Sequence, residues 1–223
     1  MGDKRIRITT VSQKYIMALA GIFLMLFLVV HLSINLLMVV GDDGKLFGQA
    51  VQFMLTNPLI KITEYVLFGG FIVHILLGVI LWAVNNRARP VKYSKSLKTE
   101  NSMFSKYMIH TGVIILIFLF IHFFHFFFVK AGIVPIPEVA EGDKHDFFSM
   151  AVVTFQNPLY SLIYLVSFVF LGFHLKHAFQ SAFQSLGLNH NKYTPAIKFI
   201  GTLYAIVISV GFAIIPIYFY FFY

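Results

Sequence analysis

Four histidines recur at matched positions in apolar stretches of the chain: His31, His74, His122 and His174. Two of them follow a glycine by ten residues, Gly21 in one case and Gly112 in the other. The other two each lie seventeen residues after the asparagine of an Asn-Pro pair, at positions 57–58 and 157–158. The chain is therefore interpreted as a twofold repeat, in which each half has two apolar helices with one histidine each. Four buried histidines in two matched pairs indicate two metal centres.

The chemistry that suits such pairs is axial ligation of haem iron. The sequence has no cysteine, so a metal can bind only histidine or oxygen ligands. Two neutral imidazoles on facing helices fill both axial positions of a haem, which favours electron transfer over oxygen chemistry. A zinc site usually adds a carboxylate or a third histidine, and the apolar stretches offer almost none. The alternative is that each histidine is a polar group bonded across helices, but four at matched depths favour ligands.

The elements that must position these histidines are membrane-spanning helices. The chain has 223 residues, of which 59% are hydrophobic and 12% are charged, a composition typical of an integral membrane protein. Five stretches have the roughly 20 apolar residues that a spanning helix needs: about 15–40, 59–84, 106–130, 158–183 and 197–222. We expect a single all-α transmembrane domain over residues 1–223. Its first four helices would form a haem-binding four-helix bundle, with the fifth packed outside.

Helix-start signals indicate where the second span begins, and an acidic loop precedes the fourth span. Asn57 and Pro58 are typical of an N-cap followed by the first helical position, and they open the second span. The loop over 133–156 is acidic, and its portion from Asp146 to Thr154 could form a short helix at the membrane surface.

The distribution of charge predicts the orientation of the spans. With the N-terminus inside, the inner segments carry thirteen basic and two acidic residues, and the outer segments carry four basic and seven acidic residues. The resulting charges, +11 and −3, agree with the tendency of basic residues to remain on the cytoplasmic side. The basic residues assigned to the inner side are Lys4, Arg5, Arg7, Lys14, Arg87, Arg89, Lys92, Lys95, Lys98, Lys106, Lys176, Lys192 and Lys198. The N-terminus is therefore expected inside and the C-terminus outside.

This orientation sorts the four histidines by depth. His31 and His122 fall in the outer half of the bilayer, and His74 and His174 fall in the inner half, with roughly 10 Å between the two levels at 1.5 Å per residue. The depths pair His31 with His122 and His74 with His174. The two pairs would then form a path for electrons across the membrane.

Other polar residues near the spans have possible supporting roles. His125 and His177 each lie one turn beyond a paired histidine and share nearly the same face. His177, beside Ser181 and one turn nearer the inner surface than His174, could bind a haem propionate or a quinone oxygen. His125 could do the same outside, or its side chain could reach to the interface, and His110 has similar options.

The motifs together resemble a known family, the five-helix, two-haem cytochrome b subunit of succinate dehydrogenase and quinol:fumarate reductase (complex II). The matching segments are HLSIN (31–35), VHILLG (73–78), TGVIILIFLFIH (111–122) and FHLKHAFQSAFQSLG (173–187). Together with a fifth span that lacks histidine, the resemblance covers nearly the whole chain.

The resemblance implies a haem b distal to the catalytic subunits, on His31 and His122, and a proximal haem b on His74 and His174. It implies a bacterial cytoplasmic membrane protein that belongs to an enzyme without binding the dicarboxylate itself. Its partners would be a flavoprotein with FAD and an iron–sulfur protein on the cytoplasmic face, a quinone such as menaquinone, and membrane lipid, but no nucleic acid.

Three further residues follow as candidates within this framework. Glu64 is the only carboxylate inside a span, and we expect it to accept a proton at a quinone site. The alternative is a surface carboxylate paired with Lys61, one turn earlier. Arg87 and Lys14, like Ser181, are candidate propionate partners near the inner face.

Two other functions fit the pattern. One is the dihaem cytochrome b subunit of another respiratory enzyme, of the hydrogenase or formate dehydrogenase type. The other is a transporter whose histidines bind a metal ion or relay protons. A haem spectrum would separate the cytochromes from the transporter, and succinate oxidation by the copurified complex would separate the two cytochromes.

Overall fold

The computed structural model describes residues 10–87, 100–136 and 143–223, and these residues form helices without a β-strand. Five helices are long and apolar enough to cross a membrane, so the predicted all-α membrane fold is confirmed. The spanning helices are α1 (Thr10–Asn35), α3 (Pro58–Arg87), α4 (Glu100–His122), α7 (Pro158–Ser185) and α8 (Thr194–Phe221). Helix α1 continues into the 3-10 helix η1 (Leu36–Val39). Helix α4 continues through the π-helix η2 (Phe123–Phe127) into the short helix α5 (Phe128–Lys130).

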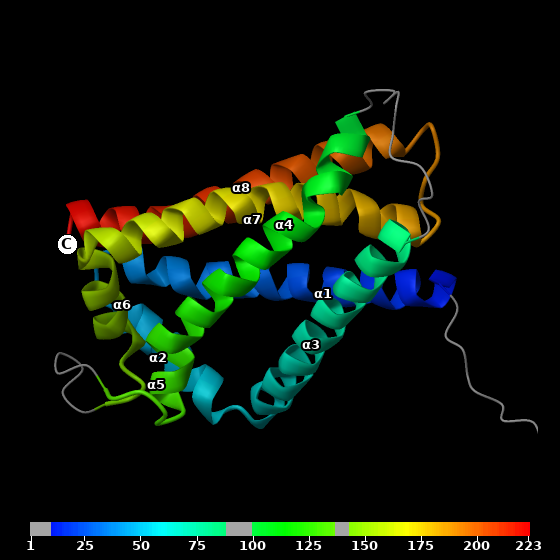
Figure 1. The fold of residues 1–223 in the computed structure, drawn as a ribbon. Coiled ribbons are helices and arrows are strands. Elements are labelled where there is room, and N and C mark those ends of the chain that lie inside the picture. The colour runs from blue at the N-terminus through cyan, green and yellow to red at the C-terminus, as the bar shows by residue number, and fades with distance from the viewer. Residues whose placement is uncertain (1–9, 88–99, 137–142) are drawn as a thin grey trace, which may run out of the picture.

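Helices α1, α7 and α8 form the most closely packed part of the molecule. In Figure 1 these three run roughly side by side, while α3 and α4 cross the view at an angle to them. Helix α8 buries a stripe of residues at intervals of three and four, which is one face of a helix: Ala205, Ile208, Phe212, Ile215 and Phe219. Its main partners are α7, α6 and α1.

Helix α3 is the least enclosed of the spans, and none of its residues is buried. Its principal partner is α1, and it approaches α4 over only a short stretch. With 30 residues and a rise of 1.5 Å per residue, α3 is about 45 Å long, which exceeds the hydrocarbon thickness of a bilayer and is accommodated by tilt. The exposed apolar side chains of α3 are therefore suited to contact with lipid.

Two short helices lie together at one end of the bundle, which we call the α2–α6 end (Figure 1). The sequence predicted α6 (Phe147–Gln156), and the Asp146 side chain caps it by accepting a hydrogen bond from the backbone N–H of Ser149 at 3.0 Å. Helix α2 (Lys45–Thr56) was not predicted. It completes the repeat, because each half now consists of a spanning helix, a short helix and a second spanning helix.

The Asn-Pro pairs begin the second spanning helix of each half, as predicted. The Asn57 side chain accepts a hydrogen bond from the backbone N–H of Leu59 at 2.9 Å, and Asn157 accepts one from Leu159 at the same distance. Proline follows at the first helical position, where a missing N–H costs no helical bond. These caps fix where α3 and α7 start, and thus the level of the histidine in each.

Candidate metal centres

The structure brings His31 on α1 and His122 on α4 together. Their ring centroids are 5.9 Å apart and their planes are nearly perpendicular, at 85°. A phenylalanine one turn earlier stacks on each histidine: Phe27 on His31 at 5.1 Å and Phe118 on His122 at 5.9 Å. These stacks hold both rings in place within apolar surroundings.

The second pair, His74 on α3 and His174 on α7, is also brought together. The ring centroids are 6.4 Å apart with an interplanar angle of 65°. A metal ion bonds an imidazole nitrogen at about 2 Å, so two imidazoles on opposite sides of one ion have centroids roughly 6 Å apart. Both pairs have a separation of this size, and in both pairs the two histidines come from different halves of the repeat.

The repeated glycines lie against the histidines of the second pair. A Cβ added at Gly21 would lie 3.8 Å from Cε1 of His74, and one at Gly112 would lie 3.7 Å from Cε1 of His174. Each glycine precedes a histidine of the first pair by ten residues, which at 1.5 Å per residue is about 15 Å along the helix. The two pairs therefore occupy separate levels, somewhat farther apart than the sequence predicted.

Hydrogen bonding divides the four imidazoles into two kinds. Nδ1 of His174 lies 3.2 Å from the Thr111 hydroxyl, and Nδ1 of His31 lies 3.3 Å from the Asn35 amide nitrogen. Nδ1 of His74 and Nδ1 of His122 are buried without a hydrogen-bond partner in the described part of the chain. A buried unpaired polar atom costs about 1–3 kcal/mol, and such atoms are retained where a side chain has a functional role.

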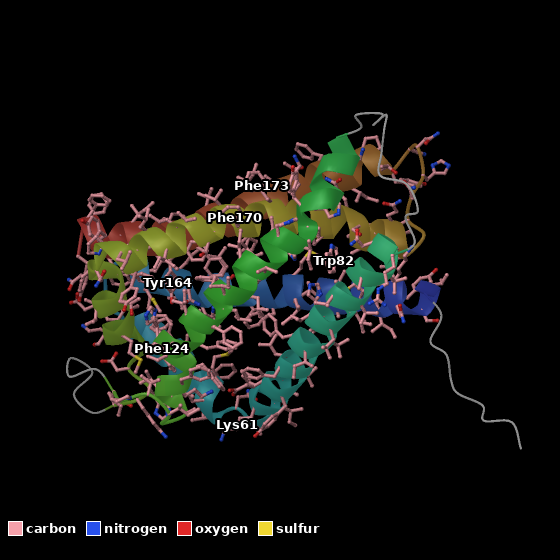
Figure 2. The ribbon with its side chains drawn as sticks, viewed as in Figure 1. Lys61, Trp82, Phe124, Tyr164, Phe170 and Phe173 are labelled. Carbon is pink, nitrogen blue, oxygen red and sulfur yellow. The ribbon has the colours of Figure 1, made fainter. Side chains whose placement is uncertain are left out.

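His125 has partners of its own and does not join the first pair. Its Nδ1 lies 3.0 Å from the Tyr164 hydroxyl on α7, and its ring also contacts Tyr160 at 4.6 Å between centroids. Tyr164 is buried within the bundle (Figure 2). The prediction that His122, rather than His125, faces His31 agrees with this geometry.

The candidate propionate partners and His110 lie toward the end opposite α2 and α6 (Figure 1). His177 is half-buried one turn beyond His174, whereas Ser181, Lys14 and Arg87 are exposed. His110 is also exposed, with its ring 5.9 Å from that of Tyr107. Several predicted inner basic residues lie outside the described residues: Lys4, Arg5, Arg7, Arg89, Lys92, Lys95, Lys98 and the side chain of Lys106.

Glu64 has a different partner from the one that its sequence neighbours suggested. Both of its carboxylate oxygens accept hydrogen bonds from Lys130 Nζ, at 2.8 and 3.0 Å. Lys61, the alternative partner, is exposed at the start of α3 (Figure 2). The Lys130–Glu64 contact joins residues 66 positions apart, so no local pattern in the sequence could have revealed it.

Aromatic rings lie beside this ion pair where α3 meets the end of α4. The ring of Phe68 on α3 lies 5.7 Å from that of Phe123 and 5.0 Å from that of Phe127. Lys130 Nζ lies 5.8 Å from the Phe127 centroid. Phe123 and Phe127 belong to the π-helical segment η2, which starts immediately after His122, and such segments often occur at functional sites. We call Phe68, Phe123, Phe127, Lys130 and Glu64 together the α3–η2 cluster.

Each pair offers two imidazole ligands, which suits a haem better than a metal ion that needs three or more protein ligands. Among the described residues, no group of three or more His, Asp or Glu side chains could hold a metal ion together. Two imidazoles per centre are the number that a six-coordinate haem requires. No family model, curated protein or solved structure matches the chain.

Proposed function

We propose that the chain is the membrane-anchoring dihaem cytochrome b subunit of a succinate:quinone oxidoreductase. It would carry electrons between two cytoplasmic subunits, a flavoprotein and an iron–sulfur protein, and a quinone in the membrane. We propose menaquinone as that quinone. The observation that supports the proposal most strongly is the meeting of four span histidines in two pairs at two levels.

Each pair of imidazoles would hold one haem b. Held by two imidazoles, the haem iron supplies one-electron transfer without an open position for oxygen. His31 and His122 would hold the distal haem, and His74 and His174 the proximal one. The stacked Phe27 and Phe118 fix the orientation of the distal ligands.

The α3–η2 cluster is the part of the chain best suited to a quinone. Both oxygens of Glu64 accept hydrogen bonds from the Lys130 ammonium, which holds in a fixed position a carboxyl group of the kind that exchanges protons with a substrate. Phe68, Phe123 and Phe127 offer apolar ring surfaces that a quinone could contact beside that carboxylate. Glu64 would thus take or return the proton that accompanies quinone chemistry near the distal centre.

The proposed orientation places the α2–α6 end outside a bacterial cytoplasmic membrane and the opposite end inside. The basic charge assigned to the inner side would favour docking of the flavoprotein and iron–sulfur subunits there. His177, Ser181, Lys14 and Arg87 lie toward the same end and would be available to the propionates of the proximal haem.

A spectroscopic and compositional measurement tests the proposal. The full chain, purified with its native partners from a haem-replete host, is expected to contain two haems b and to copurify with flavin. Succinate should reduce both haems. A colourless chain without iron would support a transporter instead. Haem that hydrogen or formate reduces, but succinate does not, would support the cytochrome of a different respiratory complex.

A further inference from the structure

Thr111 makes a contact with His174 whose direction can be derived from the number of available protons. The Thr111 hydroxyl donates to the backbone carbonyl of Met108 at 2.9 Å, and its oxygen lies 3.2 Å from Nδ1 of His174. A threonine hydroxyl has one proton and two acceptor lone pairs. Because the Met108 carbonyl can only accept, we assign the Thr111 proton to it, and Nδ1 of His174 is then the donor to Thr111.

This direction determines which nitrogen of His174 can bind a metal. A neutral imidazole has one N–H and one free lone pair. With the proton on Nδ1, the lone pair lies on Nε2, which is the nitrogen then able to bind iron. Gly112, the next residue of α4, lies against Cε1 of the same ring. Helix α4 therefore covers the Nδ1–Cε1 edge of His174 and leaves its coordinating nitrogen free.

The internal repeat identifies the matching position in the other half. Gly112 and His122 correspond to Gly21 and His31, an offset of 91 residues, so Thr111 corresponds to Ala20. Gly21 lies against Cε1 and Nδ1 of His74, just as Gly112 lies against His174. Alanine offers no hydroxyl, and Nδ1 of His74 is one of the buried ring atoms without a partner.

We propose that Thr111 is the positioning residue of the His74/His174 centre, and that the Thr111/Ala20 difference makes its two axial ligands unequal. The proposal rests on the haem assignment given above. A hydrogen bond from the second ring nitrogen fixes the tautomer and increases the basicity of the ligand. A more basic ligand stabilises the ferric state. Thr111 therefore lowers the reduction potential of the proximal haem and strengthens its binding.

The test removes the hydroxyl at position 111 and, separately, adds one at position 20, both in the purified haem-containing complex. Thr111→Val, which keeps the shape and removes the acceptor, is expected to raise the midpoint potential of the proximal haem alone. Loss of such a partner costs about 10- to 100-fold in metal affinity, so this haem should also be released more readily. Thr111→Ser is expected to restore both properties. Ala20→Thr, which supplies the missing acceptor to His74, should lower the same potential.

A matched control is provided by Thr63 on α3. Its hydroxyl donates to the Leu59 carbonyl at 2.9 Å within the helix, and its side chain is exposed. Thr63→Val should leave both potentials unchanged. A Thr111→Val variant with wild-type potentials and haem retention would overturn the positioning role while leaving the cytochrome assignment intact. A wild-type complex without haem would instead overturn the assignment and the inference together.

Discussion

His122 and His125 lie one turn apart, yet their side chains have different neighbours. His122 faces His31 across the bundle, whereas Nδ1 of His125 bonds to Tyr164. We predict that His122→Ala loses one of two haems and that His125→Ala keeps both. Haem content per polypeptide, measured from the absorbance of the pyridine complex, checks this. Full haem content in His122→Ala would contradict the assigned ligand.

A second prediction at the residue scale concerns the Lys130–Glu64 ion pair of the α3–η2 cluster. Glu64→Gln removes the proton acceptor but keeps the size of the side chain, so quinone reduction should fall by about 100-fold, the effect of a general base. Both haems should remain. Lys130→Met should also reduce the rate, because the half-buried Glu64 carboxylate then has no cation.

Lys61→Met is the control for this pair, since it removes a nearby positive charge that is exposed. Steady-state quinone reduction by the assembled complex is the measurement. Equal rates for Glu64→Gln and the wild type would exclude Glu64 from the quinone site.

At the scale of elements, α2 and α6 approach each other closely at Gly44. This residue has a φ of +77°, and a Cβ at its position would lie 2.5 Å from the Phe148 ring. We predict that Gly44→Ala destabilises the chain by about 1–2 kcal/mol for the left-handed backbone alone, and by more for the clash. Gly41 also has positive φ, at +87°, but nothing lies within 4 Å of its Cβ position.

Gly41→Ala therefore isolates the backbone cost and serves as the control for the contact with Phe148. The midpoint of thermal unfolding in detergent compares the two variants. If both lowered the midpoint equally, the close contact between α2 and α6 would contribute nothing.

The sequence revealed the spanning helices more completely than the elements between them. Uninterrupted apolar stretches and Asn-Pro caps located all five spans, because the membrane imposes their length. Helix α2 was missed since its apolar residues, such as buried Phe47, alternate with polar ones outside any span. The π-helical segment η2 was also missed. It changes the helical register of the residues after His122, and no residue pattern within FFHFF predicts a π-helix.

At the scale of the whole molecule, five spans require the two termini to lie on opposite sides of the membrane. The chain has no cysteine, so a single introduced cysteine reports its own side. We predict that Asp43→Cys, at the α2–α6 end, reacts with an impermeant thiol reagent added outside intact cells. Lys192→Cys, in the loop before α8, should react only after the membrane is opened. The reverse pattern would invert the proposed orientation.

The repeat made the histidine pairing predictable across the whole chain, whereas the partners of those histidines were not. Equal offsets in the two halves matched His31 with His122 and His74 with His174, and the structure brings these residues together. Contacts between residues far apart in sequence, such as Thr111 with His174 or Lys130 with Glu64, depend on how the helices tilt against each other. Those contacts became apparent only in three dimensions.

The most direct test of the two-centre account is electron paramagnetic resonance of the oxidised, purified complex, combined with its haem-to-polypeptide ratio. The account predicts two low-spin ferric haems per chain in the wild type. It predicts that His74→Ala keeps only the distal haem and that His31→Ala keeps only the proximal haem. A wild-type ratio of zero, or two low-spin signals persisting in both variants, would contradict it.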